Sequence, residues 1–549
     1  MTFSAQFVDY YPDYFYLTYH ANADEGMQSW IKTFQDAIGK RETQRCRELL
    51  QMVKRLTIAP EFEQVVYHAE GMLAEQRSEY SAAISLFQRA LEMKIPNEPA
   101  DSHIILLADL ARVYQTVGEY EQAESIIQQA LQLMPNGRLH ATSITPIIQL
   151  IKIQFDRGNW EAAGDLLEKA ADMAISPEEK AILAANRGIW HSLRGEWTPS
   201  IEQFGQAISQ FKQLNLLNSL ARTHNQVGVV ALEQRDFLLG RHHLTKGLEI
   251  AQKLDDWQTI NHLLGNFALL LAEEGEVEQA IDVCTQAILS LDALGDRFAL
   301  ATFYRLRGTF YHDITSYELA LADHQQCLQL VQSMEVRPNI AATYINLGNV
   351  YRRLEQFPTA LIQYEYALTI AAEIGDHKSL ATAWNGIGTL HDLEKQYDLA
   401  EKAYQNAFEQ AYLANAGDLA ASAALGLSLN AFETLSFDVL HARLDQAEEL
   451  ATIANRYDFL MQIYLIWSDL AFLSENVEDG IQAIISACRY ATRDGPVSVK
   501  MVQEHFEFYE GLLSKRAYQA MRLALQPAIQ HEAFFQSEAS WRPWLASLN

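Results

Sequence analysis

Hydrophobic and small residues recur along the chain in a fixed frame, with polar positions between them. The clearest column consists of eleven small residues: Ala90, Ala130, Ala170, Ala207, Gly247, Ala287, Cys327, Ala367, Ala407, Ala447 and Ala487. Successive members lie 40 residues apart, except for one step of 37 between Ala170 and Ala207. Self-similarity at this period is typical of arrays in which one supersecondary unit is repeated and stacked.

Two further columns predict the structure of each unit. Nineteen residues before each small residue the chain carries Gly, Ala or Ser, except at Ile151, and such side chains let two helices cross closely. Ten residues before it stands an aromatic residue or valine: Tyr80, Tyr120, Trp160, Trp197, Phe237, Val277, Tyr317, Phe357, Tyr397, Phe437 and Val477. We therefore expect each unit to be a hairpin of two helices, with this large residue at the turn into the second helix.

Turn-forming residues agree with that frame. Glycines stand two residues before the large column in four units, where the end of a helix needs a residue that tolerates positive φ: Gly118, Gly158, Gly195 and Gly275. Between units, three Gly-Asp pairs are each expected to stop one helix and cap the next: Gly295-Asp296, Gly375-Asp376 and Gly417-Asp418.

These columns resemble the tetratricopeptide repeat. One unit shows nearly its whole consensus: Tyr344, Leu347, Gly348, Tyr351, Phe357, Ala360, Tyr364 and Ala367. The resemblance covers residues 61–494, and the 40-residue unit is similar to the longer-helix subclass of kinesin light chains, spindle adaptors, bacterial pheromone sensors and MalT-like sensor regions. It implies an all-α fold, a right-handed α-solenoid of stacked helical hairpins.

The predicted organisation has four parts. Residues 1–25 form an aromatic N-terminal arm, 26–60 an opening helical hairpin, 61–494 eleven repeats, and 495–549 capping helices and a tail. The arm is expected to pack on the opening hairpin, because so many aromatic side chains are poorly accommodated in water. The alternative is that it binds a partner.

Composition narrows the choice of partners. The formal net charge is −28, whereas nucleic-acid binders usually carry a basic excess, so nucleic acid is not expected as a principal ligand. No apolar run is long enough to span a membrane, and the N-terminus lacks the pattern of a secretion signal. Four scattered cysteines do not form a disulfide framework, so a cytoplasmic location is predicted.

Amide and guanidinium side chains are concentrated at first-helix positions that line the concave face of such an array. The candidate partner-binding residues are Asn186, Asn225, Gln226, Asn266, Arg305, Asn346, Asn349, Arg352, Arg353 and Asn385. A carboxamide both donates and accepts, so a ladder of amides suits the main chain of an extended peptide, while arginines suit carboxylates. The resemblance implies the same use. The alternative is that these amides only bond to neighbouring repeats or water.

The corresponding positions of the last two repeats are apolar instead. They are Leu425, Leu429, Phe432, Leu465 and Phe472. If these side chains face solvent, they form an apolar contact surface. The favoured interpretation is that tail helices at 499–514 and 515–526 cover them, because a repeat array needs a cap at each end.

Motifs for catalysis, cofactors and metals were not found. The chain has no phosphate-binding G-x-x-x-x-G-K-[ST] loop, no G-x-S-x-G, no H-E-x-x-H and no paired C-x-x-C. His324 and Cys327 have a spacing that metal ligands or a nucleophile and its base also show, but both occupy packing columns. We interpret them, and Cys284, as buried structural residues.

These observations predict a non-enzymatic solenoid that binds another protein or an extended peptide, including acidic ones, without a cofactor or metal. It would act as an adaptor or regulatory subunit. Two alternatives remain: a ligand- or peptide-sensing regulatory protein of a signalling system, and a structural subunit of a larger complex that uses its arm or convex face. Oligomeric state is not predicted.

Overall fold

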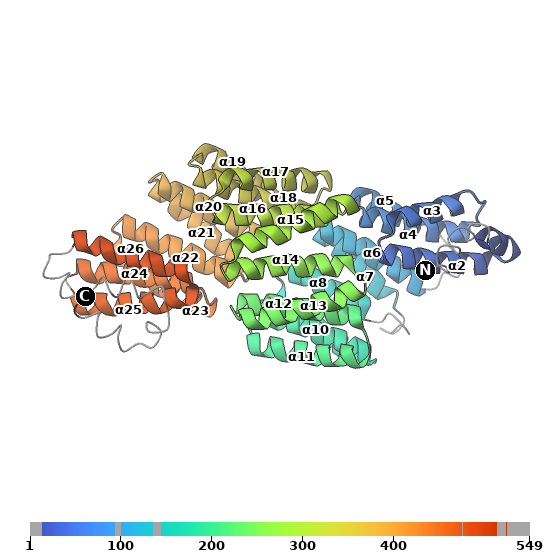
Figure 1. Cartoon of the computed structure of the whole chain (residues 1–549), viewed down its shortest axis with the longest axis horizontal. Coiled ribbons are helices and arrows are strands. Elements are labelled where there is room, and N and C mark those ends of the chain that lie inside the picture. The colour runs from blue at the N-terminus through green and yellow to red at the C-terminus, as the bar shows by residue number, and fades with distance from the viewer. Residues whose placement is uncertain are drawn as a thin grey trace. The chain divides into compact units, whose positions relative to one another are not determined.

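The computed structural model describes residues 14–93, 100–134, 144–174, 176–474, 476–512 and 523. Within these ranges the regular elements are α-helices, as predicted (Figure 1). The chain divides into two compact units: unit 1 contains residues 1–356 and 369–375, and unit 2 contains 357–368 and 376–549. Among the described helices, none is long and apolar enough to cross a membrane.

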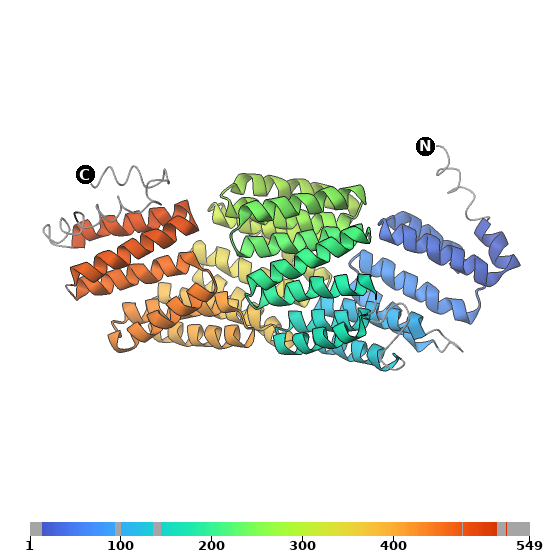
Figure 2. The ribbon, with the colours of Figure 1, turned by 90° about the horizontal axis from the view of Figure 1, so that it is seen from below.

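Consecutive helices pair as hairpins, and Figure 2 shows how they stack within each unit. The first helices of the eleven repeats are α4 (Pro60–Gln76), α6 (Ala100–Val117), α8 (Thr145–Asp156), α10 (Pro177–Leu193), α12 (Leu217–Glu233), α14 (Trp257–Glu273), α16 (Arg297–Asp313), α18 (Arg337–Arg353), α20 (His377–Leu393), α22 (Gly417–Glu433) and α24 (Tyr457–Leu473). The second helices are α5 (Tyr80–Glu92), α7 (Tyr120–Gln132), α9 (Trp160–Met173), α11 (Trp197–Gln213), α13 (Phe237–Lys253), α15 (Val277–Leu294), α17 (Tyr317–Ser333), α19 (Phe357–Ile374), α21 (Tyr397–Leu413), α23 (Phe437–Ile453) and α25 (Val477–Asp494). The flanking helices are α2 (Ala23–Gly39), α3 (Thr43–Lys54) and α26 (Pro496–Leu512).

The repeat frame predicted from the sequence is confirmed in every repeat. Each second helix begins at the residue of the large column, from Tyr80 in α5 to Val477 in α25. The eleven small marker residues all lie in second helices and are all buried. The frame therefore reports the packing of one helix on the next.

Glycines of the first helices mark close crossings. A Cβ atom added to Gly188 would lie 2.7 Å from the ring of Phe204, and one added to Gly388 would lie 2.6 Å from the ring of Tyr404. Both rings come from the second helix of the same hairpin, three residues before the marker alanine. These glycines therefore leave the space that the large residue of the partner helix fills.

Left-handed residues end the first helices, and glycine is one of several residue types found there. The four predicted glycines have φ between 72° and 87°. Other repeats place a non-glycine residue with positive φ at the same turn: Ser78, Arg235, Thr315, Glu355, Lys395 and Leu435. Sequence reasoning missed these, because their side chains carry no mark of the left-handed conformation.

Two of the three predicted Gly-Asp junctions are confirmed. Gly295 and Gly375 adopt positive φ, and the Asp that follows each of them accepts a hydrogen bond from the first turn of the next helix. The prediction for Gly417-Asp418 was wrong. That pair begins α22, two residues later in the repeat than the other pairs, and Asn415 supplies the left-handed turn.

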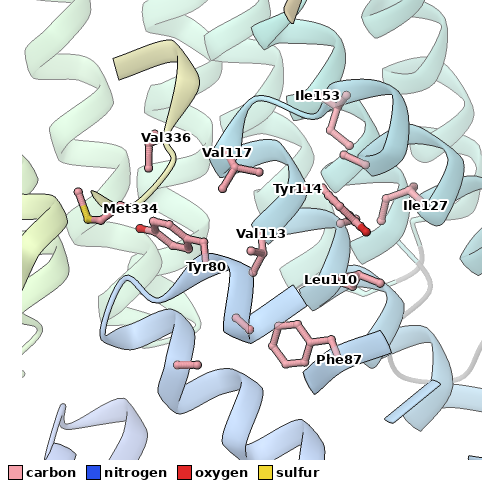
Figure 3. Packing of buried hydrophobic residues seen from close by; sticks show 14 of the residues in the cluster. Tyr80, Phe87, Leu110, Val113, Tyr114, Val117, Ile127, Ile153, Met334 and Val336 are labelled. Carbon is pink, nitrogen blue, oxygen red and sulfur yellow. The ribbon is translucent and has the colours of Figure 1, made fainter. Parts of the chain in front are cut away.

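The first repeats of unit 1 contact repeats that lie more than two hundred residues later (Figure 3). Tyr80, at the start of α5, packs with Met334 and Val336 in one buried cluster, and its ring meets that of Phe298 edge-on at 6.5 Å. Nearby, the hydroxyl of Ser81 donates a hydrogen bond of 2.7 Å to Glu335. This surface, called the closing contact below, joins the beginning of α5 to α16 and to the turn between α17 and α18.

The described part of the aromatic arm is helical at residues 14–21 and packs on the opening hairpin. Phe15 and Tyr19 are buried in a cluster with Trp30 and Phe34, and the indole N–H of Trp30 donates to the carbonyl of Leu49. Tyr14 and Tyr16 are half exposed. The remaining aromatic residues of the predicted arm, Phe3, Phe7, Tyr10 and Tyr11, lie outside the described residues.

Helix α26 covers the last hairpin of unit 2. Val502, Phe506 and Tyr509 are buried against α24 and α25. The Tyr509 hydroxyl donates to Asp469 at 2.5 Å and lies 2.7 Å from the Ser468 hydroxyl. The second predicted capping helix, at 515–526, falls outside the described residues except at Leu523.

Candidate functional site

Unit 1 encloses a hollow of about 880 Å³. Its lining comes from two groups of helices that are far apart in the sequence: α2, α4 and α6, and then α12, α14 and α16. With the exception of α2, these are first helices of their repeats, the helices from which the sequence predicted a groove. The closing contact joins the same two regions of unit 1, around Tyr80 and Phe298, and both residues also line the hollow.

Four of the predicted binding residues line the hollow: Asn225, Gln226, Asn266 and Arg305. The side-chain amide of Asn266 donates a hydrogen bond of 2.9 Å to Asn225 Oδ1 in the preceding repeat. Part of the amide ladder therefore bonds between neighbouring repeats, as the alternative interpretation of these residues expected. Gln226 and Arg305 are half buried.

The other six predicted residues do not line this hollow. Asn346, Asn349, Arg352 and Arg353 lie on α18, Asn385 lies on α20 in unit 2, and Asn186 on α10 donates to the carbonyl of Ile182 within its own helix at 2.8 Å. Asn186 Oδ1, Arg352 Nε and Asn385 Oδ1 are buried atoms without a hydrogen-bond partner among the described residues. The structure thus brings together one subset of the predicted residues.

Several lining residues were missed by sequence reasoning: Gln76, Arg112, Arg222, Asn261 and His262. Arg112 occupies the same repeat column as Asn349, so that column, followed into the early repeats, would have found it. Arg222 and His262 share a column one helical turn earlier in the first helix, which the concave-face pattern did not include. No signal in the sequence shows that α6 and α12 line one cavity.

Ion pairs neutralise two of the arginines in the hollow. Arg41 pairs with Asp296, and Arg112 pairs with Glu75 and, at 2.7 Å, with Asp109. Asp296 also caps α16 by accepting from the Ala299 N–H, and Asp256 caps α14 by accepting from the N–H and hydroxyl of Thr259. Carboxylates of the lining are therefore committed to structural bonds.

Two amide atoms in the lining have unused hydrogen-bonding capacity. Gln76 donates to the carbonyl of Ile38 at 3.1 Å, but its Oε1 is buried without a partner among the described residues. Asn261 Nδ2 on α14 is likewise buried without a hydrogen-bond partner among the described residues. Burial lowers the pKa of the Arg305 guanidinium, and burial together with the charge of Arg222 lowers the pKa of His262. The hollow thus presents neutral amides, cations and a histidine held toward its neutral form.

The apolar residues predicted as a contact surface in the last repeats are mostly covered. Leu465 and Phe472 belong to the core beneath α26, where Phe472 meets Tyr509 edge-on at 4.9 Å. Leu425 and Phe432 pack in the core of the preceding hairpin. Leu429 is 37 % exposed. These residues do not form an exposed wall, because the adjacent helices bury Leu425 and Leu465 and partly bury Phe432 and Phe472.

His324 and Cys327, which the sequence analysis interpreted as structural residues, are buried in unit 1. His324 and Cys327 are each 1 % exposed, and Cys327 Sγ lies 3.4 Å from the hydroxyl of Thr343. Burial lowers the pKa of His324 to about 3 and raises the pKa of the Cys327 thiol, which opposes the imidazolium and thiolate forms. Within the described ranges no three His, Cys, Asp or Glu residues are grouped so that they could hold a metal ion.

Comparison with known families agrees with the geometry. Residues 298–373 and 339–412 match one tetratricopeptide repeat model, and residues 106–140 match a second. These segments overlap the hairpins of α6 and α7 and those formed by α16 to α21. The chain therefore contains tetratricopeptide repeats.

Solved structures with a similar arrangement share little sequence with the chain. A STAND signal transduction ATPase with a tetratricopeptide repeat sensor, from Pyrococcus horikoshii, is 15% identical with a TM-score of 0.39, over 68% of this chain and 52% of its own. The chain thus spans about half the length of that structure. Yeast Tom70 is 14% identical with a TM-score of 0.41, over 86% of this chain and 100% of its own. The quorum sensor NprR from B. thuringiensis is 14% identical with a TM-score of 0.41, over 59% of this chain and 99% of its own. Curated protein sequences gave no significant match.

Proposed function

We propose that this protein is a binding scaffold, an adaptor or regulatory subunit, that holds a segment of another protein or an extended peptide in the hollow of unit 1. The observation that carries the proposal is the unused hydrogen-bonding capacity of the lining, at Gln76 Oε1 on α4 and Asn261 Nδ2 on α14. A buried polar atom without a partner costs about 1 to 3 kcal/mol. A peptide main chain offers a donor and an acceptor at nearly every residue and can satisfy both atoms.

Size and shape support the same proposal. A volume of about 880 Å³ lies in the range of pockets that enclose a compact ligand. Gln226 and Trp257 add an amide and an indole that is 40 % exposed. Aromatic side chains with partial exposure are common anchors in binding surfaces. We include in the proposal that the protein is not an enzyme and that it works in the cytoplasm, where its four free, buried cysteines remain reduced.

Asn266 and Asn346 provide a matched test, because they occupy the same column of the repeat and only the first lines the hollow. Peptides selected from a random library against the full chain are titrated by calorimetry into wild type, Asn266→Ala and Asn346→Ala. Loss of one neutral hydrogen bond is expected to weaken binding to Asn266→Ala by about 2- to 10-fold. Equal affinity for both variants, with the fold intact by circular dichroism, would place the ligand outside the hollow.

A sensor function is the second candidate, and the position of the hollow favours it. The lining includes both sides of the closing contact, so a ligand that touches both sides couples its binding energy to that contact. Hydrogen exchange separates the two functions. Slower exchange in α5 and α18 on peptide addition indicates a sensor, whereas unchanged exchange there indicates a passive scaffold.

A further inference from the structure

The hollow carries the opposite charge balance from the rest of the chain. The protein has a formal net charge of −28, yet four arginines line the hollow against three carboxylates: Arg41, Arg112, Arg222 and Arg305, and Glu75, Asp256 and Asp296. A concave surface surrounded by protein concentrates the field of the charges that line it. The local excess of cations therefore acts on whatever enters.

Two of these arginines have no carboxylate partner. Within the described part of the chain, neither Arg222 nor Arg305 takes part in an ion pair, and the contact of Arg222 with the Thr259 hydroxyl is long, at 3.5 Å. The carboxylates close to them are used elsewhere, since Asp256 and Asp296 cap helices and Asp296 also pairs with Arg41. Both guanidinium groups are thus available to a ligand.

Lys152 on α8 does not line the hollow, but its charge interacts with that of Arg222. Its side chain is exposed to solvent, yet the surrounding protein together with the charges of Arg222 and Arg112 lowers the pKa of its ammonium group. Asp156 acts in the opposite direction. An anion bound at Arg222 reduces this repulsion between like charges.

We propose that the hollow of unit 1 binds an anionic ligand, whose carboxylate or phosphate groups are held by Arg222 and Arg305. This inference rests on the proposed function and gives the chemistry of its ligand. The anion is carried either by an acidic peptide segment or by a small molecule, and both present the same oxyanion to the arginines. A guanidinium group binds such an oxyanion through two parallel hydrogen bonds, which an ammonium group cannot do.

Neutral groups of the lining complement this arrangement. Asn261 Nδ2, on α14 between the helices that carry the two arginines, is a donor without a partner and can bond to a further oxygen of the same ligand. The hydrogen-bonded amides of Asn225 and Asn266 lie on α12 and α14 as well. The ligand class that fits these groups has at least one oxyanion and further hydrogen-bonding atoms.

The test uses the full chain and four probes: inorganic phosphate, citrate, acetylated and amidated tri-glutamate, and the matching tri-glutamine. Calorimetric titration at low salt is expected to show saturable binding of an anionic probe and none of tri-glutamine. Tighter binding of tri-glutamate than of citrate or phosphate indicates a peptide source, and the reverse order a small molecule. Either order supports the proposed chemistry. Absence of saturable binding of all three anionic probes overturns it.

Paired variants locate the site. The double variant Arg222→Gln with Arg305→Gln is expected to bind the anionic probe with an affinity lower by about tenfold or more, because each charge-assisted hydrogen bond is strong. The control, Arg47→Gln combined with Arg55→Gln, removes the same charge from exposed positions outside the hollow and should change affinity by less than about twofold. Equal losses in the two double variants overturn the inference.

Two additions keep the test decisive. Lys152→Gln changes an exposed side chain, so the fold should be kept. The affinity of this variant for the anionic probe should be several-fold lower than that of wild type. The library-selected peptides of the preceding section are also titrated into the Arg222 and Arg305 double variant. Unchanged affinity there, together with loss in Asn266→Ala, overturns the anion chemistry and leaves the proposed function standing. If the peptides bind both variants with unchanged affinity, the proposed function itself is overturned.

Discussion

The hollow of unit 1 and the last hairpins of unit 2 use the same column of the repeat in opposite ways. Twenty-two residues before the marker, unit 1 places Asn225 and Arg305, which line the hollow, whereas unit 2 places Leu425 and Leu465, which pack in apolar cores. Exposure alone does not separate the two regions, because Asn225 and Leu465 are both 8 % exposed. Backbone geometry and helix boundaries are the same in both regions. The difference shows that the repeat fixes where a side chain points, while its polarity decides whether it joins a hydrogen-bonded lining or an apolar core.

The largest expected effect comes from uncovering the last hairpin. Phe506 in α26 is 1 % exposed, so Phe506→Ala should lower the free energy of unfolding of unit 2 by about 3 to 5 kcal/mol through lost burial and a cavity. Phe508 in the same helix is 58 % exposed, and Phe508→Ala should change stability by less than about 0.5 kcal/mol. Urea unfolding monitored by circular dichroism measures both. Similar midpoints for the two variants would show that α26 is not a structural cap.

A second variant tests what the two regions share. Gly388→Leu should cost about 3 kcal/mol, because even its Cβ would lie 2.6 Å from the ring of Tyr404. Gly188→Leu, against Phe204 in unit 1, should cost a similar amount of stability. Gly348 occupies the same column of the repeat, so the same cost is expected for Gly348→Leu. Gly205 has no atom within 4 Å of an added Cβ, so Gly205→Leu serves as the control and should be neutral or slightly stabilising. Thermal midpoints of Gly188→Leu and Gly388→Leu equal to that of the control would contradict the close crossing.

Exchanging the two side chains of the divergent column sharpens the comparison further. Leu425→Asn should destabilise unit 2 by about 2 to 3 kcal/mol, because it loses apolar burial and buries an amide. Asn225→Leu removes the acceptor of Asn266 in the hollow and should cost about 1 kcal/mol. Chemical unfolding of both variants measures the difference. Equal costs would mean that the hollow is packed as tightly as the core of unit 2.

Acid sensitivity is expected from the buried imidazole of His324 in unit 1. Burial, and next the charge of Arg305, lowers the pKa of His324 to about 3, so the unfolded chain binds the proton first as the pH falls. Stability from this group is complete above pH 6.5 and decreases below it, by up to about 2 kcal/mol between pH 6.5 and 5. His324→Phe keeps an aromatic ring at this position and removes the titrating group. Its unfolding free energy should therefore fall less than that of wild type over this interval, and an identical decrease would rule out His324 as the source.

The fold could be predicted from the sequence because the repeat frame depends on local packing. Each hairpin needs a small residue where helices cross and a large one at the turn. The residue type and position of Gly388 and Tyr397 therefore identify these two roles in the sequence. The turns were predicted less completely. Thr315 and Glu355 adopt the left-handed conformation of Gly275 without being glycine, because the flanking helices hold them there.

The candidate site was predicted in part. Asn225, Gln226, Asn266 and Arg305 line the hollow, since the columns identify the inner face of each first helix. Which repeats share a cavity is a long-range property. It depends on the path of the stacked helices and on the closing contact, and neither follows from the frame of a single repeat. For the same reason the pattern could not show that Arg112 and Arg222 line one hollow.

The closing contact also changes how unit 1 is expected to fold. In an open array each repeat touches only its neighbours, so stability is roughly a sum of local terms and the ends can fray independently. Here Ser81 bonds to Glu335 and Arg41 to Asp296, at sequence separations of 254 and 255 residues. Such contacts form only after most of the intervening chain is ordered, which slows folding and links the first repeats to the later ones in one cooperative transition. Unit 1 thereby gains the all-or-none character of a globular domain from a sequence built of short local units.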